Sequence, residues 1–90
     1  MKNYWKLRCA LDKINWLTAG MKCSISIDED GNASALVYSL KEWESIPCDD
    51  IHIYEVKREE RKRVKYYEKF FDDKTICINT NETFYREVSQ

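Results

Sequence analysis

Two residues of the chain have side chains that could pair in nucleophilic catalysis. His52 is the only histidine, and Cys48 precedes it by four residues. A cysteine nucleophile needs an imidazole base beside its thiol, and acyl transfer also needs donors for the oxyanion. No nucleophile elbow or oxyanion signature accompanies this pair. The sequence therefore favours a histidine at the surface or half-buried on a strand, and we expect no enzyme activity.

Metal and cofactor chemistry has equally little support in the sequence. The four cysteines, at positions 9, 23, 48 and 77, are widely spaced and form no C-x-x-C pair. A zinc site commonly uses two close pairs of ligands, and only Cys48 and His52 form even one loose pair. No glycine-rich loop is present that could bind phosphate through its backbone. We expect four free thiols that act as small apolar side chains, no metal and no cofactor.

Segregation of charge is the strongest pattern in the chain. The 15 basic and 16 acidic side chains give a formal net charge of −1. Residues 1–27 carry five basic and one acidic side chain, residues 28–55 carry one basic and eight acidic, and residues 56–71 carry seven basic and three acidic. The near-neutral total argues against a general polyanion binder and against an acidic mimic of nucleic acid. The segregation predicts separate surfaces of opposite sign.

The basic block coincides with a segment, residues 58–71, whose apolar spacing predicts a second helix. Its basic residues recur at helical spacing and would share one face, which consists of Arg58, Lys62, Lys65 and Lys69, with Arg61 beside them. This face could contact an acidic protein surface or the phosphates of nucleic acid. It could equally be a solvated face with internal ion pairs between neighbouring turns.

The acidic block predicts a second candidate surface. Its first part is similar to the start of a calcium loop, but the twelfth residue counted from Asp28 is Ser39 instead of glutamate, so the calcium pattern fails. Asp30-Gly31 instead suits a hairpin turn. The acidic surface that could meet a basic partner consists of Asp28, Glu29, Asp30, Glu42 and Glu44.

Trp43 lies between Glu42 and Glu44 and is a further candidate contact. If partly exposed, it would anchor a partner, because tryptophan is enriched among the residues that dominate binding energy. Alternatively, it covers one end of a small core, where its large apolar ring is most useful. The sequence leaves both interpretations open.

The elements that must position these residues follow from hydrophobic periodicity. Apolar residues at spacings of three and four predict a helix over residues 3–18, with Gly20 as its stop. Strict alternation predicts a hairpin of two strands, 21–28 and 33–40. Residues 41–50 fit either a helical turn or a strand end. Further strands are predicted at residues 51–56, 75–79 and 83–88.

With a helix at 58–71, the predicted order is α-β-β-β-α-β-β. This order indicates an α+β fold in which two helices pack on an antiparallel-rich sheet of about five strands. A β-α-β unit over residues 51–79 would add one parallel pair. Ninety residues suit one domain, residues 1–90.

The N-terminal residues are interrupted by charges, and the longest apolar run is four residues, 35–38. A secretion signal or a membrane span needs a longer apolar stretch, about 20 residues for a span. We therefore expect a cytoplasmic chain that contacts no membrane. It would be a monomer or a homodimer, since strand edges are available for pairing.

These observations predict a small, non-enzymatic protein–protein interaction module that docks on a larger protein or protein–nucleic acid complex. In size and general character the chain resembles small accessory proteins of phages and mobile elements, including anti-CRISPR inhibitors, although no particular residues carry this resemblance. The resemblance implies a host defence or nuclease complex as the target, blocked sterically. The alternative is a nucleic-acid-binding accessory protein that uses the basic face of the 58–71 helix.

Overall fold

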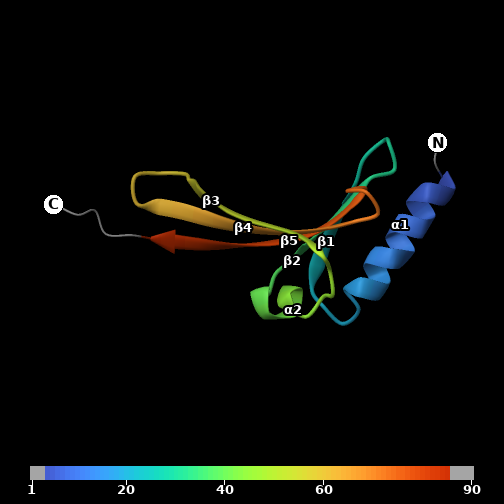
Figure 1. The fold of residues 1–90 in the computed structure, drawn as a ribbon, viewed down its shortest axis with the longest axis horizontal. Helices are drawn as coiled ribbons and strands as arrows, with labels where there is room; N and C mark the ends of the chain where they lie inside the picture. Colours follow the sequence, from blue (N-terminus) through green and yellow to red (C-terminus); the bar gives the residue numbers. More distant parts are fainter. Residues whose placement is uncertain (1–3, 86–90) are drawn as a thin grey trace.

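The computed structural model describes residues 4–85, which form two helices and five strands (Figure 1). In chain order the elements are α1 (Tyr4–Leu17), β1 (Cys23–Ile27), β2 (Ala33–Val37), α2 (Leu40–Glu44), β3 (Asp50–Lys57), β4 (Lys62–Phe71) and β5 (Ile76–Tyr85). The strands form a sheet in the order β1-β2-β5-β4-β3. Every neighbouring pair is antiparallel except β2 and β5, which are parallel. The predicted α+β fold with an antiparallel-rich sheet is therefore confirmed.

The molecule is elongated, with extents of 56 × 26 × 22 Å. Strands β3, β4 and β5 extend as a ribbon away from the helices, and α1 lies at the opposite end (Figure 1). Both helices pack on the same face of the sheet, against β2 and β5. Strand alternation directs to this face the buried side chains Ala33, Ala35, Val37, Ile76 and Ile78.

The helix predicted over residues 3–18 and the following hairpin are both present, as α1 and as β1 with β2. Ile14 is fully buried against the sheet, whereas Trp16 is 75% exposed. After the helix, Gly20 adopts a φ of 81°, a left-handed conformation that glycine takes without steric cost. Neither helix within residues 4–85 has the length and apolar character needed to cross a membrane.

The helix predicted over residues 58–71 is wrong, because residues 62–71 form strand β4. The apolar side chains that suggested helical spacing also fit a strand, with Val64 and Phe70 on one face and Tyr67 and Phe71 on the other. Five of the ten residues of β4 are β-branched or aromatic, a composition that favours strands. The strand lies between β3 and β5 and pairs with both, so tertiary pairing acts in the same direction as this preference.

This correction changes the order of the elements. The second helix is the short α2, which begins at Leu40 and continues into the segment 41–50 that the sequence left undecided, so the observed order is α-β-β-α-β-β-β. The strands predicted at 75–79 and 83–88 belong to one continuous strand, β5, with residues 86–88 outside the described part. The predicted parallel pair within residues 51–79 is also wrong, because β3 and β5 are separated by β4.

Trp43 covers the core and is not an exposed anchor. It is only 3% exposed, and its indole Nε1 donates a hydrogen bond of 2.8 Å to the carbonyl of Ile78 in β5. Its ring contacts that of Tyr67 in β4, with 5.3 Å between the ring centroids. The side chain of Ser39 caps the start of α2 by accepting from the backbone N–H of Glu42 at 3.3 Å. These contacts fix the short helix to the sheet.

Lys69 of β4 is also buried, at 3% exposure, directly beneath α2. Its Nζ donates to the carbonyl oxygens of Trp43 at 2.7 Å and of Ile46 at 2.6 Å, with that of Glu44 at 3.4 Å. It also lies 4.1 Å from the centroid of the Trp43 ring. A cation suits the carbonyl oxygens at a helix C-terminus, and it adds to the bond that the Trp43 carbonyl already accepts from the backbone N–H of Ile46 at 3.1 Å. Although burial lowers the pKa of this amine, its three acceptors make Lys69 a structural residue instead of a surface contact.

We expect Lys69→Met to lower the free energy of unfolding by about 2 kcal/mol, because it leaves buried carbonyl oxygens without their donor. Urea denaturation followed by tryptophan fluorescence measures this. The matched control is Lys41→Met on the exposed side of α2. This substitution should change the free energy of unfolding by less than about 0.5 kcal/mol. Equal losses in the two variants would contradict the role assigned to Lys69.

Tyr67 gives the fold a dependence on alkaline pH. Its burial, reinforced by a hydrogen bond donated to the Glu82 carboxylate, raises its pKa from 10.0 to about 12. Above pH 10 the unfolded chain therefore releases a proton that the folded chain retains. The stability from this group is complete below pH 10 and is lost as the pH rises towards 12.

We expect Tyr67→Phe to show a smaller fall in the free energy of unfolding between pH 10 and pH 12 than the parent protein. Denaturation curves collected at several pH values in this range provide the measurement. Parallel pH profiles for the two proteins would show that Tyr67 does not contribute.

Candidate interaction surface

The basic residues predicted to share one surface are divided by the strand geometry. Arg58 and Arg61 are exposed in the turn between β3 and β4. In β4, alternation places Lys62 on the face away from the helices and Lys65 on the helix-bearing face, while Lys69 is buried under α2. The expected continuous basic face does not exist, because side chains spaced for one face of a helix fall on both faces of a strand.

The acidic residues are divided in a similar way. Asp28, Glu29 and Asp30 lie in the exposed turn before β2. Glu42 and Glu44 lie on α2, which follows the opposite end of β2. The turn itself has a structural role for its first carboxylate. Asp28 accepts hydrogen bonds from the backbone N–H groups of Asp30 and Asn32, both at 2.9 Å, and from the Asn32 side chain at 3.1 Å. These bonds, led by that from the Asn32 backbone, lower the pKa of Asp28.

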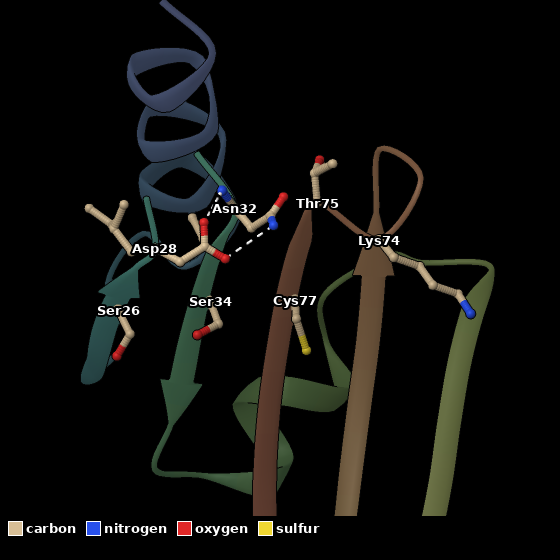
Figure 2. Close-up of a pocket in the computed structure, with 9 residues that line it drawn as sticks. Ser26, Asp28, Asn32, Ser34, Lys74, Thr75 and Cys77 are labelled. Carbon is tan, nitrogen blue, oxygen red and sulfur yellow. Dashed lines mark hydrogen bonds between the residues drawn. The ribbon is translucent and has the colours of Figure 1, made fainter. Parts of the chain in front are cut away.

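The face of the sheet opposite the helices is the most extensive candidate surface. Within residues 4–85, neither helix packs on this face, which we call the open face. On β1, β2 and β5 it carries mostly small polar side chains together with Leu36, and Figure 2 shows Ser26, Ser34 and Cys77 on these neighbouring strands. On β3 and β4 the side chains are larger, and four of the nine that the register places on this face carry rings.

Four ring side chains on β3 and β4, His52, Tyr54, Tyr66 and Phe70, form what we call the aromatic row. Tyr54 and Tyr66 lie directly opposite each other and are stacked, with ring centroids 5.3 Å apart and planes at 27°. His52 meets Phe70 edge to face, with centroids 5.2 Å apart. Tyr54 is 46% exposed. The rings are therefore held in place by each other while keeping area available for a partner.

Charged groups border the aromatic row and lie within it. Arg58 lies over the Tyr66 ring at 5.5 Å and its Nε donates to the Tyr66 hydroxyl at 3.1 Å, while Lys74 lies 5.7 Å from the Phe70 ring. Glu68 lies beside the row, opposite His52. Burial, followed by the negative charge of Glu68, raises the pKa of Tyr54, so its phenol is a neutral donor at physiological pH.

A shallow, open pocket continues the open face towards the β1–β2 turn. Its volume is about 380 Å³, and its lining includes Ser26, Asp28, Ser34, Thr75 and Cys77 (Figure 2). The adjoining β4–β5 turn holds Asp72, Asp73 and Lys74 at positive φ values of 52°, 56° and 68°. Burial raises the pKa of the Cys77 thiol, which makes it a poor nucleophile at neutral pH.

The structure does not bring Cys48 and His52 together as a catalytic pair. The Cys48 thiol donates to the Phe70 carbonyl at 3.2 Å, whereas His52 Nε2 lies 2.8 Å from the Asp50 carboxylate. All four cysteines are free thiols. In residues 4–85, the side chains of His, Cys, Asp and Glu form no group of three or more that could hold a metal ion.

Sequence reasoning missed the open face because it assigned residues 58–71 to a helix. The available signal was the alternation in β3 and β4. Tyr54, Tyr66 and Phe70 occupy even positions and therefore share the face that the helices leave uncovered. Helical spacing of the basic residues in the same segment concealed this alternation.

We expect iodoacetamide to label Cys9 at least about tenfold faster than Cys77, because Cys9 is exposed on α1 while Cys77 is partly buried with a raised pKa. Mass spectrometry of peptides after short labelling pulses measures both rates in one sample. Equal rates would show that the open face around Cys77 is more accessible than its partial burial implies.

Comparison of the chain with protein-family models, with curated protein sequences and with solved structures finds no match. No relative therefore supplies a function or a site that could be compared with this surface. The functional argument rests on the geometry of the open face itself.

Proposed function

We propose that the chain is a non-enzymatic protein-binding module that docks on a larger protein through its open face. The observation that supports this proposal is the aromatic row, which lies on a sheet face that neither helix covers within residues 4–85. Tyrosine and other aromatic side chains supply much of the energy at protein interfaces. Here they project from paired strands, so little conformational freedom would be lost on binding.

The balance of charge on this face favours a protein partner over nucleic acid. Arg58 and Lys74 border the aromatic row, while Lys62, Glu68 and Asp50 lie on the same face. A surface that binds the phosphate backbone of nucleic acid needs a clear excess of positive charge, because neutralisation of the phosphates supplies much of the binding affinity. Serine, asparagine and tyrosine, which this face carries, are instead enriched in the antibody loops that recognise folded proteins.

The mode of action that suits such a surface is steric. A standard interface buries about 800 Å² on each partner, and a five-stranded sheet face is broad enough to supply this area. A bound module of this kind would cover a functional surface of its target without chemistry of its own. A host defence or nuclease complex is the target implied by the resemblance to phage inhibitors.

A nucleic-acid-binding function is the second candidate, and one observation favours it. The stacked pair Tyr54–Tyr66, with the Arg58 guanidinium over Tyr66, resembles platforms on which unpaired bases stack. Because the 58–71 helix does not exist, this candidate would also depend on the open face. It differs from protein binding in its salt dependence.

The proposal is tested by affinity capture with tagged protein from lysate of the native host, with and without nuclease, followed by mass spectrometry. We expect a stoichiometric protein partner that survives nuclease and moderate salt. Tyr54→Ala should weaken this complex about tenfold or more, as removal of a central aromatic contact does. The matched control is Trp16→Ala, which removes an exposed ring from α1 and should leave binding unchanged.

Two outcomes would overturn the proposal. Loss of the captured material on nuclease treatment, with a steep loss on adding salt, would assign the open face to nucleic acid. A complex that resists Tyr54→Ala but is lost with Trp16→Ala would place the docking surface on α1. Circular dichroism of each variant confirms that the fold is retained.

A further inference from the structure

Strand β3 is an edge of the sheet, and this edge is unusually long for one left uncovered. In residues 4–85 it pairs with β4 on one side and with no strand on the other. It spans eight residues, nearly all of them exposed, and neither helix packs on it. Native proteins normally shorten, charge or cover such edges, because their free backbone groups can pair with another chain.

The direction of the backbone groups follows from one hydrogen bond. The N–H of Arg58 donates to the carbonyl of Lys62 at 3.0 Å, so Arg58 directs its backbone groups towards β4. The pairing of β3 with β4 continues from this point without interruption. Because consecutive residues alternate in direction in an antiparallel pair, Ile51, Ile53 and Lys57 direct their N–H and C=O groups outward.

The same edge exposes apolar area on the helix-bearing face. Ile51 and Ile53 are 47% and 52% exposed, although isoleucine is among the residues most often buried. Both lie in β3 opposite residues of β4 that contact α2, Ile51 opposite Lys69 and Ile53 opposite Tyr67. A strand added to β3 would cover these two side chains as well as pairing the outward backbone groups.

The charges along β3 identify the strand that fits. Asp49 and Asp50 lie at its beginning, and Lys57 and Arg58 lie at its end. A strand that runs in the opposite direction therefore needs basic residues where β3 is acidic and acidic residues where β3 is basic. A second copy of β3 meets this requirement, since an antiparallel pairing places its basic end against the acidic end of the first.

We propose that the protein forms a symmetric homodimer by antiparallel pairing of two β3 strands, with the two-fold axis at Ile53. In this register Asp49 lies opposite Lys57 of the partner subunit, in two symmetric pairs, and the two Ile53 side chains lie together. The open face of each copy stays on the same side of the joined sheet, with Tyr54 opposite His52 of the partner subunit. A two-fold contact of this kind is closed, so it stops at the dimer.

The proposal is tested by sedimentation equilibrium from low to high micromolar concentration. We expect a reversible monomer–dimer equilibrium in the parent protein. Asp49→Lys and Lys57→Glu should each weaken self-association about tenfold or more, because each places like charges opposite each other twice. These positions are chosen because Asp50 and Arg58 have contacts within the chain, to His52 and Tyr66.

A mixture of the two variants supplies the decisive control. Asp49→Lys has a lysine at both ends of β3, and Lys57→Glu has a carboxylate at both ends. The two should therefore pair with each other although neither pairs with itself. Lys22→Glu, beside the other edge strand β1, should leave the equilibrium unchanged.

Amide hydrogen exchange supplies a readout that needs no substitution. The outward N–H of Ile53 should be protected more strongly as the protein concentration rises, while the Tyr54 N–H, already directed towards β4, should change little. A protein that remains monomeric at every concentration overturns the proposal. A dimer that is weakened by Lys22→Glu but not by the two β3 variants overturns it as well, and assigns the contact to β1.

Discussion

The fold depends on a buried ammonium group beneath a one-turn helix. Lys69 donates to carbonyl oxygens at the end of α2 and lies against the Trp43 ring, which in turn donates to β5. A five-residue helix has little stability of its own, because nucleation costs more than its few hydrogen bonds return. These contacts hold α2 on one face of the sheet. Both helices therefore share that face, and within residues 4–85 neither helix covers the other face.

The properties of the open face follow from this one-sided packing. A sheet covered on both faces would hold apolar side chains on both, as parallel sheets usually do. Here the uncovered face carries serine and asparagine on β1, β2 and β5, and rings on β3 and β4 that are stacked on each other. The rings are thus fixed by cross-strand contacts before any partner is present. The basic groups near them act as neighbours of the rings, not as a separate phosphate-binding strip.

The parts of the fold that local pattern determines were predictable from the sequence. The helix before Gly20 and the hairpin around Asp30-Gly31 each show a clear periodicity of apolar residues. Glycine marks the end of the helix and the turn of the hairpin. Residues 62–71 were not predictable in the same way, since their aromatic and basic residues satisfy helical and strand spacing together. Pairing with β3 and β5 on its two sides makes this segment a strand. The prediction of Lys69 and Trp43 as surface contacts was wrong for the same reason, because their burial depends on contacts between distant parts of the chain.

The parallel pair at the centre of the sheet sets a constraint on how the chain can fold. Ala33 of β2 pairs with Ile76 of β5, and α2, β3 and β4 lie between them in sequence. During synthesis the two hairpins, β1–β2 and β3–β4, are therefore complete before the strand that joins them exists. Closing this long loop is entropically costly and makes folding slow compared with local pairing. Until β5 is in place, each hairpin exposes an unpaired inner edge, so the nascent chain is most open to mispairing immediately before its last strand arrives.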